Sequence, residues 1–382
     1  MKLLTALLCT TLLLRPAFTQ PVNLQSSFAA FMPHAGFGVD STLPVWPKHK
    51  FSFTTPRFQS ALLTTASLTE SNRSLKAVLG FTKNNRPVEL YYFPGTSNKK
   101  ALVIGGVHGS ELSAMDVVKQ LLEELENGVE IYYSVVVIPC LFPDNAVAAL
   151  QAGKEINSTK NIGRYSHAGA PDPNRQMPPL GKAFNPLQPL DDANREIERE
   201  NQMLLHLIQD FAPDRIINVH AIRNSAKAGI FADPRTDCAG RALGYETDSL
   251  LALGMAQYIY KAGGNVSGNK LGEAQPTTLY GSDPAIAPKG SLQQRNLQGS
   301  VLPNNLGTGV SLGAWGTTAV CDEGLSQYNR PAMRVITVEF PGNKRPEDYT
   351  ASERKEHEKQ LQLYAAAISR VFLAQQFIEE DQ

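Results

Sequence analysis

The sequence has little of several features that mark large protein classes. It contains only 4 cysteines in 382 residues, which excludes a scaffold held together by many disulfides. Lysine plus arginine and aspartate plus glutamate number 36 each, so the formal net charge is zero and no basic face for nucleic acid is indicated. Beyond the first twenty residues, no apolar run approaches the roughly 20 residues of a membrane-spanning helix. We therefore expect no nucleic-acid partner and no stable membrane span in the mature chain.

The first twenty residues, MKLLTALLCTTLLLRPAFTQ, differ from the rest in composition. Lys2 is followed by a mostly apolar run and then by the small residues Ala17 and Thr19. This order is typical of a secretory signal peptide, and the apolar run is too short to cross a bilayer. We predict a signal peptide over residues 1–19 and a secreted or periplasmic location. The cysteines that remain allow one disulfide whose pairing the sequence leaves open: Cys140, Cys238 and Cys321.

The rest of the chain divides into an irregular lead-in, residues 20–74, and one domain, residues 75–382. In the domain, apolar runs of strand length alternate with amphipathic helical patterns. This alternation predicts an α/β fold with a mixed, mostly parallel central sheet flanked by helices. An opening hairpin is expected at 75–81 and 88–93, buried strands at 101–106, 131–140, 215–221 and 334–340, helices at 113–125, 191–211, 248–263 and 350–377, and long loops at 141–190 and 263–313.

Polar side chains stand where three of the predicted strands end, and ligands of parallel sheets gather beyond those ends. His108 follows the run ALVIGG, with Glu111 three residues later at the head of a helix, and His220 ends RIINVHA. Zinc favours imidazole nitrogen and carboxylate oxygen, and a catalytic zinc has three protein ligands. The alternative is that His108 bonds a loop carbonyl, Glu111 favours the helix dipole as a first-turn acid, and His220 is a core histidine.

Glu339 ends the strand RVITVEF, where a carboxylate is costly to bury without a partner. It could be the general base for a zinc-activated water, or a buried acid paired with an arginine. The loop before the third strand holds Arg164, Asn174 and Arg175. Arginine can bind a carboxylate through two hydrogen bonds or stabilise an oxyanion, although a solvated loop residue is the ordinary alternative.

Taken in order along the chain, these motifs resemble the zinc carboxypeptidase family. They read GGVHGSE, FPDN (NPDG in the family), GRYSHAGAPDPNRQMP (an arginine and then DLNRNFP in the family), INVHA and TVEFPG. The segment GVSLGAW, which begins at Gly309, is similar to bacterial members that cleave γ-D-glutamyl–diaminopimelate bonds in cell-wall peptides. The match runs over roughly residues 75–345, which makes it more specific than any single motif.

The resemblance implies a secreted metallopeptidase with one zinc ion, acting on a peptide C-terminus or a cell-wall muropeptide. It also implies a role for each candidate residue: zinc ligation by His108, Glu111 and His220, general base catalysis by Glu339, polarisation of the scissile carbonyl by Arg164, and binding of the substrate's terminal carboxylate by Asn174 and Arg175.

Some features depart from the family pattern. The stretch GAWGTTAV lacks the tyrosine that carboxypeptidases usually place before the catalytic glutamate, which favours the cell-wall-peptide branch. The 263–313 stretch is interpreted as an insertion near the site, and Asp322 and Glu323 as either surface acids or part of a pocket for a basic side chain. Two other functions stay open: an N-acyl amino acid deacylase of the aspartoacylase/succinylglutamate desuccinylase type, and a non-catalytic peptide-binding protein.

Overall fold

The computed structural model describes residues 74–153, 160–244, 246–271, 309–344 and 348–375. All of them lie in Thr42–Gln382, one of the two units into which the chain divides. The predicted signal peptide lies outside the described residues, as do all but the last residue of the predicted lead-in and most of the 263–313 stretch. In the described part, no helix is long and apolar enough to cross a membrane.

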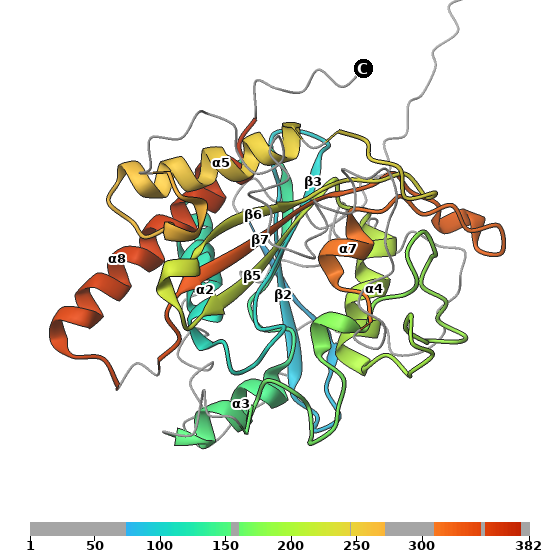
Figure 1. Ribbon diagram of the computed structural model, residues 1–382, viewed down its shortest axis with the longest axis horizontal. Helices are drawn as coiled ribbons and strands as arrows, with labels where there is room; N and C mark the ends of the chain where they lie inside the picture. The colour runs from blue at the N-terminus through green and yellow to red at the C-terminus, as the bar shows by residue number, and fades with distance from the viewer. Residues whose placement is uncertain (1–73, 154–159, 245, 272–308, 345–347, 376–382) are drawn as a thin grey trace, which may run out of the picture. The chain divides into compact units, whose positions relative to one another are not determined.

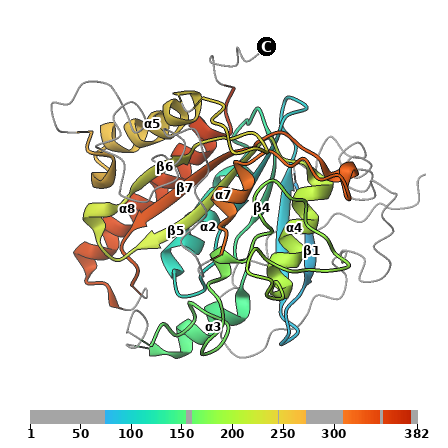
Figure 2. The ribbon, with the colours of Figure 1, turned by 45° about the vertical axis from the view of Figure 1, so that its right-hand side comes forward.

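A seven-stranded mixed sheet forms the centre of the described unit, in the order β1-β2-β4-β3-β5-β7-β6 (Figures 1 and 2). The four strands β4, β3, β5 and β7 run parallel, and β1, β2 and β6 pair antiparallel at the two sides. The predicted α/β fold is therefore confirmed. The strands are β1 Leu75–Phe81, β2 Pro87–Phe93, β3 Lys100–Ile104, β4 Ser134–Ile138, β5 Arg215–Ile222, β6 Gly229–Asp233 and β7 Arg334–Pro341.

Helices cover both faces of the sheet (Figure 1): α2 (Leu112–Glu126), α5 (Glu246–Lys261) and α8 (Ala351–Ala367) on one, α4 (Arg199–Phe211) and the short α7 (Leu312–Gly316) on the other. Successive strand residues belong to opposite layers of the core. Ala101 and Val103 pack under the first set of helices, and Leu102 and Ile104 under the second. A strand buried on both faces needs apolar side chains on both, which explains the unbroken apolar runs in the sequence.

Several predicted elements were wrong in detail. The 141–190 loop contains a helix, α3 (Pro143–Gln151), which begins with a proline that needs no hydrogen-bond acceptor there. The helix predicted over 191–211 begins only at Arg199, because the Asp191 carboxylate accepts the N–H groups of Ala193 and Arg195 and forms a turn. The last helix ends at Ala367 and passes into a π-helical turn, η9, and the edge strand β6 was not predicted. Short 3-10 turns are the remaining described elements: η4 Pro173–Arg175, η5 Ser225–Lys227, η6 Ser267–Asn269 and η7 Ser326–Tyr328. The π-helical turn η9 spans Ile368–Phe372.

Two covalent and ionic links join the loops around β6 and β7. Cys238 and Cys321 form a disulfide, and Cys140 is free and buried. The buried carboxylate of Asp248, on α5, accepts hydrogen bonds from Arg235 Nε at 2.8 Å and from Arg334 Nε at 3.0 Å. The Asp248 pair of contacts anchors α5 to the first residue of β7.

Candidate metal centre

The ends of three neighbouring parallel strands bring the predicted site residues to one edge of the sheet. His108 lies just beyond β3, His220 lies on β5, and Glu339 lies on β7. His220 and Glu339 are direct partners in the β5–β7 register. The structure thus places His108, His220 and Glu339 at the same edge of the sheet, where ligands of parallel sheets gather.

The loop between β3 and α2 is shaped by glycines. Gly106 has a positive φ of 63°, a conformation that side chains with a Cβ rarely adopt. A Cβ on Gly109 would lie 2.2 Å from the backbone nitrogen of Ala146 on α3, so only glycine allows this close approach. These two positions let the chain turn sharply enough to direct His108 and Glu111 to the same place.

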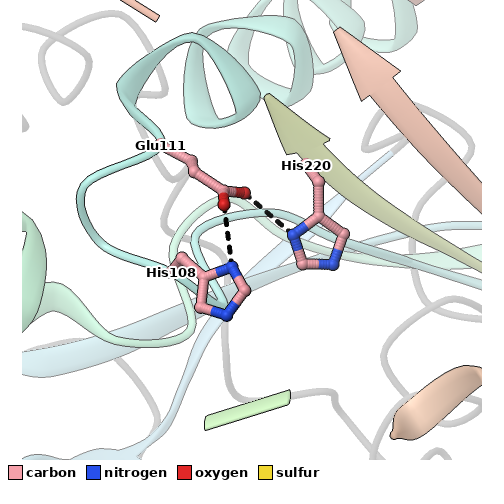
Figure 3. A group of neighbouring side chains, drawn as sticks. All are labelled: His108, Glu111 and His220. Atoms are coloured by element: carbon pink, nitrogen blue, oxygen red, sulfur yellow. Dashed lines mark hydrogen bonds and ion pairs between the residues drawn. The ribbon is translucent and has the colours of Figure 1, made fainter. Parts of the chain in front are cut away.

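Glu111 joins the two histidines (Figure 3). Its Oε1 lies 2.8 Å from His108 Nδ1, and its Oε2 lies 2.8 Å from His220 Nδ1. All three side chains are buried, and they offer one ligand atom each within 4.8 Å of one another. Two imidazole nitrogens and one carboxylate oxygen are the donor set of a catalytic zinc site, so these residues could hold a metal ion.

The simpler interpretations of these residues do not match the geometry. Glu111 is the N-cap of α2, but its side chain makes no capping hydrogen bond to the helix. Its carboxylate instead accepts from the histidines, from Arg164 NH1 at 2.9 Å and from the backbone N–H of Ala221 at 3.2 Å. His108 is bonded to carboxylates through both ring nitrogens rather than to a loop carbonyl.

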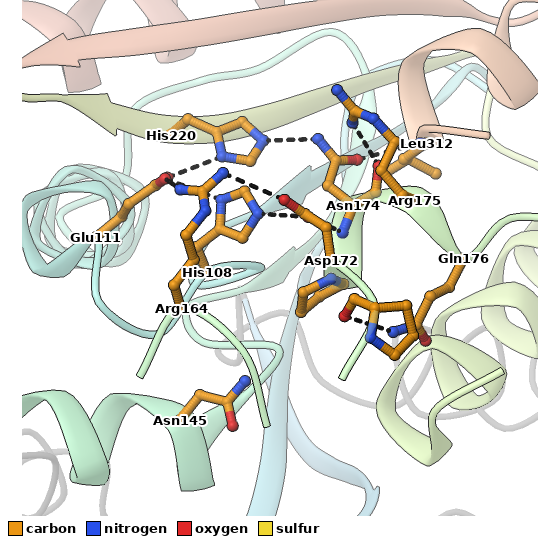
Figure 4. Close-up of polar contacts among 12 residues, drawn as sticks. His108, Glu111, Asn145, Arg164, Asp172, Asn174, Arg175, Gln176, His220 and Leu312 are labelled. Carbon is orange, nitrogen blue, oxygen red and sulfur yellow. Dashed lines mark hydrogen bonds and ion pairs between the residues drawn. The ribbon is translucent and has the colours of Figure 1, made fainter. Parts of the chain in front are cut away.

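Asp172 is part of the centre and was not predicted (Figure 4). Its Oδ1 lies 2.8 Å from His108 Nε2, the ring nitrogen on the far side from Glu111, and accepts the backbone N–H of Asn174 at 2.8 Å. A carboxylate on the outer nitrogen of a histidine fixes the ring's orientation and its tautomer, as metal-binding histidines require. In the sequence, Asp172 could have been noticed only as the acid two residues before Asn174 in the motif DPNR.

The neighbouring carboxylates and histidines of the centre shift one another's pKa values. Burial raises the pKa of Glu111, but His220 and His108 together lower it well below the usual value. Burial lowers the pKa of His108, yet Glu111 and Asp172 raise it overall to about 9. The pKa of Asp172 is lowered, because the hydrogen bond and charge of His108 and the charge of Arg164 outweigh its burial. Both carboxylates next to His108 are therefore ionised over the neutral range.

Arg164 approaches the centre from the loop after α3. Its NH1 donates to Glu111 and its NH2 lies 3.3 Å from Asp172 Oδ2. The side chain is 32% exposed, so its guanidinium reaches the cluster from the solvent side. The structure thus brings the predicted Arg164 into contact with two of the carboxylates.

The predicted pair Asn174 and Arg175 lies in the 3-10 turn η4, on the other side of the cluster (Figure 4). Asn174 Nδ2 is 3.4 Å from His220 Nε2, and Asn174 Oδ1 accepts the backbone N–H of Leu312 at the start of α7 at 3.2 Å. Arg175 NH1 donates to the carbonyl oxygen of Asn174 at 2.6 Å. The turn therefore connects His220 with α7, and Asn174 contacts the centre directly whereas Arg175 borders it.

Glu339 differs electrostatically from the other acids. Burial raises its pKa, the charge of Glu111 raises it further, and His220, His108 and Arg164 only partly offset these effects. A carboxyl group with a raised pKa next to a possible metal site is a candidate proton acceptor.

The chain was compared with family models, with curated proteins and with solved structures, and only the solved structures gave matches. No family model matches the chain, and no curated protein matches it. A metallo-carboxypeptidase from Burkholderia cenocepacia is 14% identical, with a TM-score of 0.41 over 82% of this chain and 69% of that one. Bovine thrombin-activatable fibrinolysis inhibitor, solved with a tick carboxypeptidase inhibitor, is 12% identical, with a TM-score of 0.43 over 83% and 97%. The murein-tripeptide amidase MpaA from Escherichia coli O157 is 18% identical, with a TM-score of 0.37 over 76% and 91%. The chain is similar to these three solved structures at 12–18% identity.

The short helix α7 carries the GAW segment. Trp315 is buried, and its Nε1 donates to the carbonyl oxygen of Lys182 at 2.9 Å, so it packs the loop rather than covering the centre. Asp322 accepts the backbone N–H groups of Gly324 and Leu325 in a tight turn, and Glu323 is exposed. The Asp322 carboxylate also accepts the backbone N–H of Ala183 at 3.3 Å, so it is bonded to backbone donors of two segments.

Proposed function

We propose that this protein is a zinc-dependent hydrolase that cleaves an amide bond close to a free carboxylate. One observation supports this most: two imidazole nitrogens and a carboxylate oxygen within 4.8 Å of one another, with Asp172 on the outer nitrogen of His108. His108, Glu111 and His220 would hold the ion. Zinc at such a site supplies a Lewis acid and lowers the pKa of a water molecule to about 7.

The chain's own groups carry the proton transfers and bind the substrate. Glu339 accepts the proton of the attacking water and returns it to the leaving amine, a role that its raised pKa supports. Arg164 stabilises the negative charge that develops on the carbonyl oxygen. Asn174 and Arg175 bind the free carboxylate of the substrate, which places the scissile bond near the centre.

For the substrate, we favour a cell-wall muropeptide over an ordinary protein C-terminus. The segment GVSLGAW and the missing tyrosine support this choice, and so does the apolar leader over residues 1–19, which would deliver the enzyme to the periplasm or outside the cell. The second candidate is deacylation of N-acyl amino acids, which the same centre could perform. The third, peptide binding without catalysis, would not need both a metal site and a carboxyl group with a raised pKa beside it.

A hydrolysis screen tests these functions. Purified protein would be offered γ-D-glutamyl–diaminopimelate tri- and tetrapeptides, standard C-terminal peptide substrates, and N-succinyl and N-acetyl amino acids, each with and without chelator. We expect chelator-sensitive release of the terminal residue from the cell-wall peptides. Preferential cleavage of the acyl amino acids would select the second candidate, and a metal-free protein that is inert on every substrate would select the third.

Glu339→Gln tests the mechanism. We expect kcat to fall about 10²–10⁴-fold, because the proton acceptor is lost, while one zinc ion per chain remains bound. Glu358→Gln is the matched control, since Glu358 is an exposed glutamate on α8. Full activity in Glu339→Gln, or an equal loss in Glu358→Gln, would refute the role of Glu339.

A further inference from the structure

The backbone of one buried residue, Ser110, links three segments of the centre. The backbone N–H of Ser110 donates to the carbonyl oxygen of Gly163 at 2.9 Å. The carbonyl oxygen of Ser110 accepts the side-chain N–H of Asn343 from Nδ2 at 2.6 Å. Ser110 is 7% exposed and Asn343 is 5% exposed, so water cannot easily replace these bonds.

Each of the three segments carries a different part of the proposed machinery. Ser110 lies between the two candidate ligands His108 and Glu111. Gly163 directly precedes Arg164. Asn343 follows Glu339 after only three intervening residues. The backbone N–H and carbonyl groups of Ser110 therefore connect the ligand loop to the loop of the arginine and to the end of the strand that carries the proposed base.

A second bond holds the same end of β7 to the strand of the other histidine. The backbone N–H of Gly342 donates to the carbonyl oxygen of Ile222, at 2.9 Å, and Ile222 is two residues beyond His220. Gly342 has a φ of 88°, which lets the chain turn there so that the next residue, Asn343, points back to Ser110. Glu339 is thereby bracketed: its own strand end is bonded to both segments that carry the histidines.

We propose that Asn343 is a positioning residue that fixes the distance between Glu339 and the metal ligands. It acts through its hydrogen bond to the Ser110 carbonyl and does not itself touch the substrate. The physical reason is that a proton acceptor must be held within hydrogen-bond reach of the reacting water, and a displacement of about 1 Å can cost roughly 10²-fold in rate. The inference rests on the proposed function, because it assigns to Glu339 and the ligands the roles given there.

Asn343→Ala removes the donor, and Asn343→Asp keeps the size of the side chain but sets a carboxylate oxygen against the Ser110 carbonyl. The matched control is Gln209→Ala on α4, since Gln209 Nε2 also donates to a backbone carbonyl, that of Phe184 at 2.9 Å, outside the centre. Four quantities are measured for the full-length chain: zinc affinity by competition with a chelator, kcat, KM, and the midpoint of thermal unfolding without metal.

For both Asn343 variants we expect kcat to fall about 10- to 100-fold, KM to stay within about twofold, and zinc affinity to fall about tenfold. The Gln209 control should lose thermal stability only. If Asn343→Ala does not fold, Asn343→Asp decides. Variants with wild-type kcat and zinc affinity, or with losses no larger than those of the control, would overturn the positioning role alone. Wild-type protein that binds no zinc would overturn the proposed function, and the positioning role with it.

Discussion

Replacing Asp172 with asparagine should weaken metal binding without unfolding the protein. The carboxylate accepts three hydrogen bonds, from His108 Nε2 at 2.8 Å, from the N–H of Asn174 at 2.8 Å and from Arg164 NH2 at 3.3 Å. Asparagine has nearly the same shape but no charge, and its single oxygen cannot serve all three donors. The bonds to the histidine and the arginine are charge-assisted and are the ones most weakened.

The size of the effect follows from these bonds. A hydrogen bond to a charged group contributes roughly 1.5–3 kcal/mol and a neutral one roughly 0.5–1.5 kcal/mol, so each affected bond loses about 1 kcal/mol. Asp172 is 23% exposed, so water partly replaces the loss. A net loss of about 1.4–2.7 kcal/mol corresponds to a 10- to 100-fold rise in the zinc Kd, the range found for outer partners of metal ligands.

Competition with a chromogenic chelator at neutral pH measures this Kd. Asp237→Asn is the control, because Asp237 also accepts backbone N–H groups, from Ala239 and Arg241, and pairs with the Arg241 side chain, but on an exposed turn. An Asp172→Asn Kd within twofold of the wild-type value would refute the reasoning, as would an equal rise in the Asp237 variant.

Two further predictions concern stability. Burial raises the pKa of Glu200 to about 7, so the folded state binds the Glu200 proton more tightly than the unfolded state does. The free energy of unfolding therefore falls as Glu200 ionises between about pH 4.5 and pH 7. Glu200→Gln should therefore increase the free energy of unfolding by up to roughly 3 kcal/mol above pH 7 and by almost nothing below pH 4.5. Urea titrations at both pH values measure this difference, and a gain in stability that is independent of pH would contradict the prediction. Asp248→Ala, measured in the same way, should lose about 3 kcal/mol, because two part-buried arginines lose their carboxylate partner. A loss under 1 kcal/mol would argue against that cluster as an anchor of α5.

The positions of His108, His220 and Glu339 could be predicted because the architecture itself dictates them. Apolar runs of strand length predicted a parallel core, and parallel strands place their carboxyl ends at one edge. The structure adds that His220 and Glu339 are direct partners in the β5–β7 register, which the sequence did not predict. The prediction needed no knowledge of the loops.

Asp172 and Asn343 could not be predicted in the same way. Asp172 lies in an irregular loop 64 residues from His108, and Asn343 lies 233 residues from Ser110. Neither position belongs to a periodic pattern, and the distance between them and their partners is set by how several loops pack together. Helix α3 was missed for a related reason: nine residues beginning with a proline in a turn-rich stretch look like loop until their packing is known.

The two glutamates of the centre are not interchangeable. Burial raises the pKa of Glu111, but its interactions with His220 and His108 lower that pKa well below the usual value. Glu339 is partly buried, and both its burial and the charge of Glu111 raise its pKa, which His220, His108 and Arg164 offset only in part. A metal ligand must stay ionised, whereas a group that accepts and returns a proton works best with a pKa closer to the operating pH. Two carboxyl groups whose surroundings move their pKa values in opposite directions are suited to different roles, and this difference supports the proposal that Glu111 binds the metal and Glu339 transfers the proton.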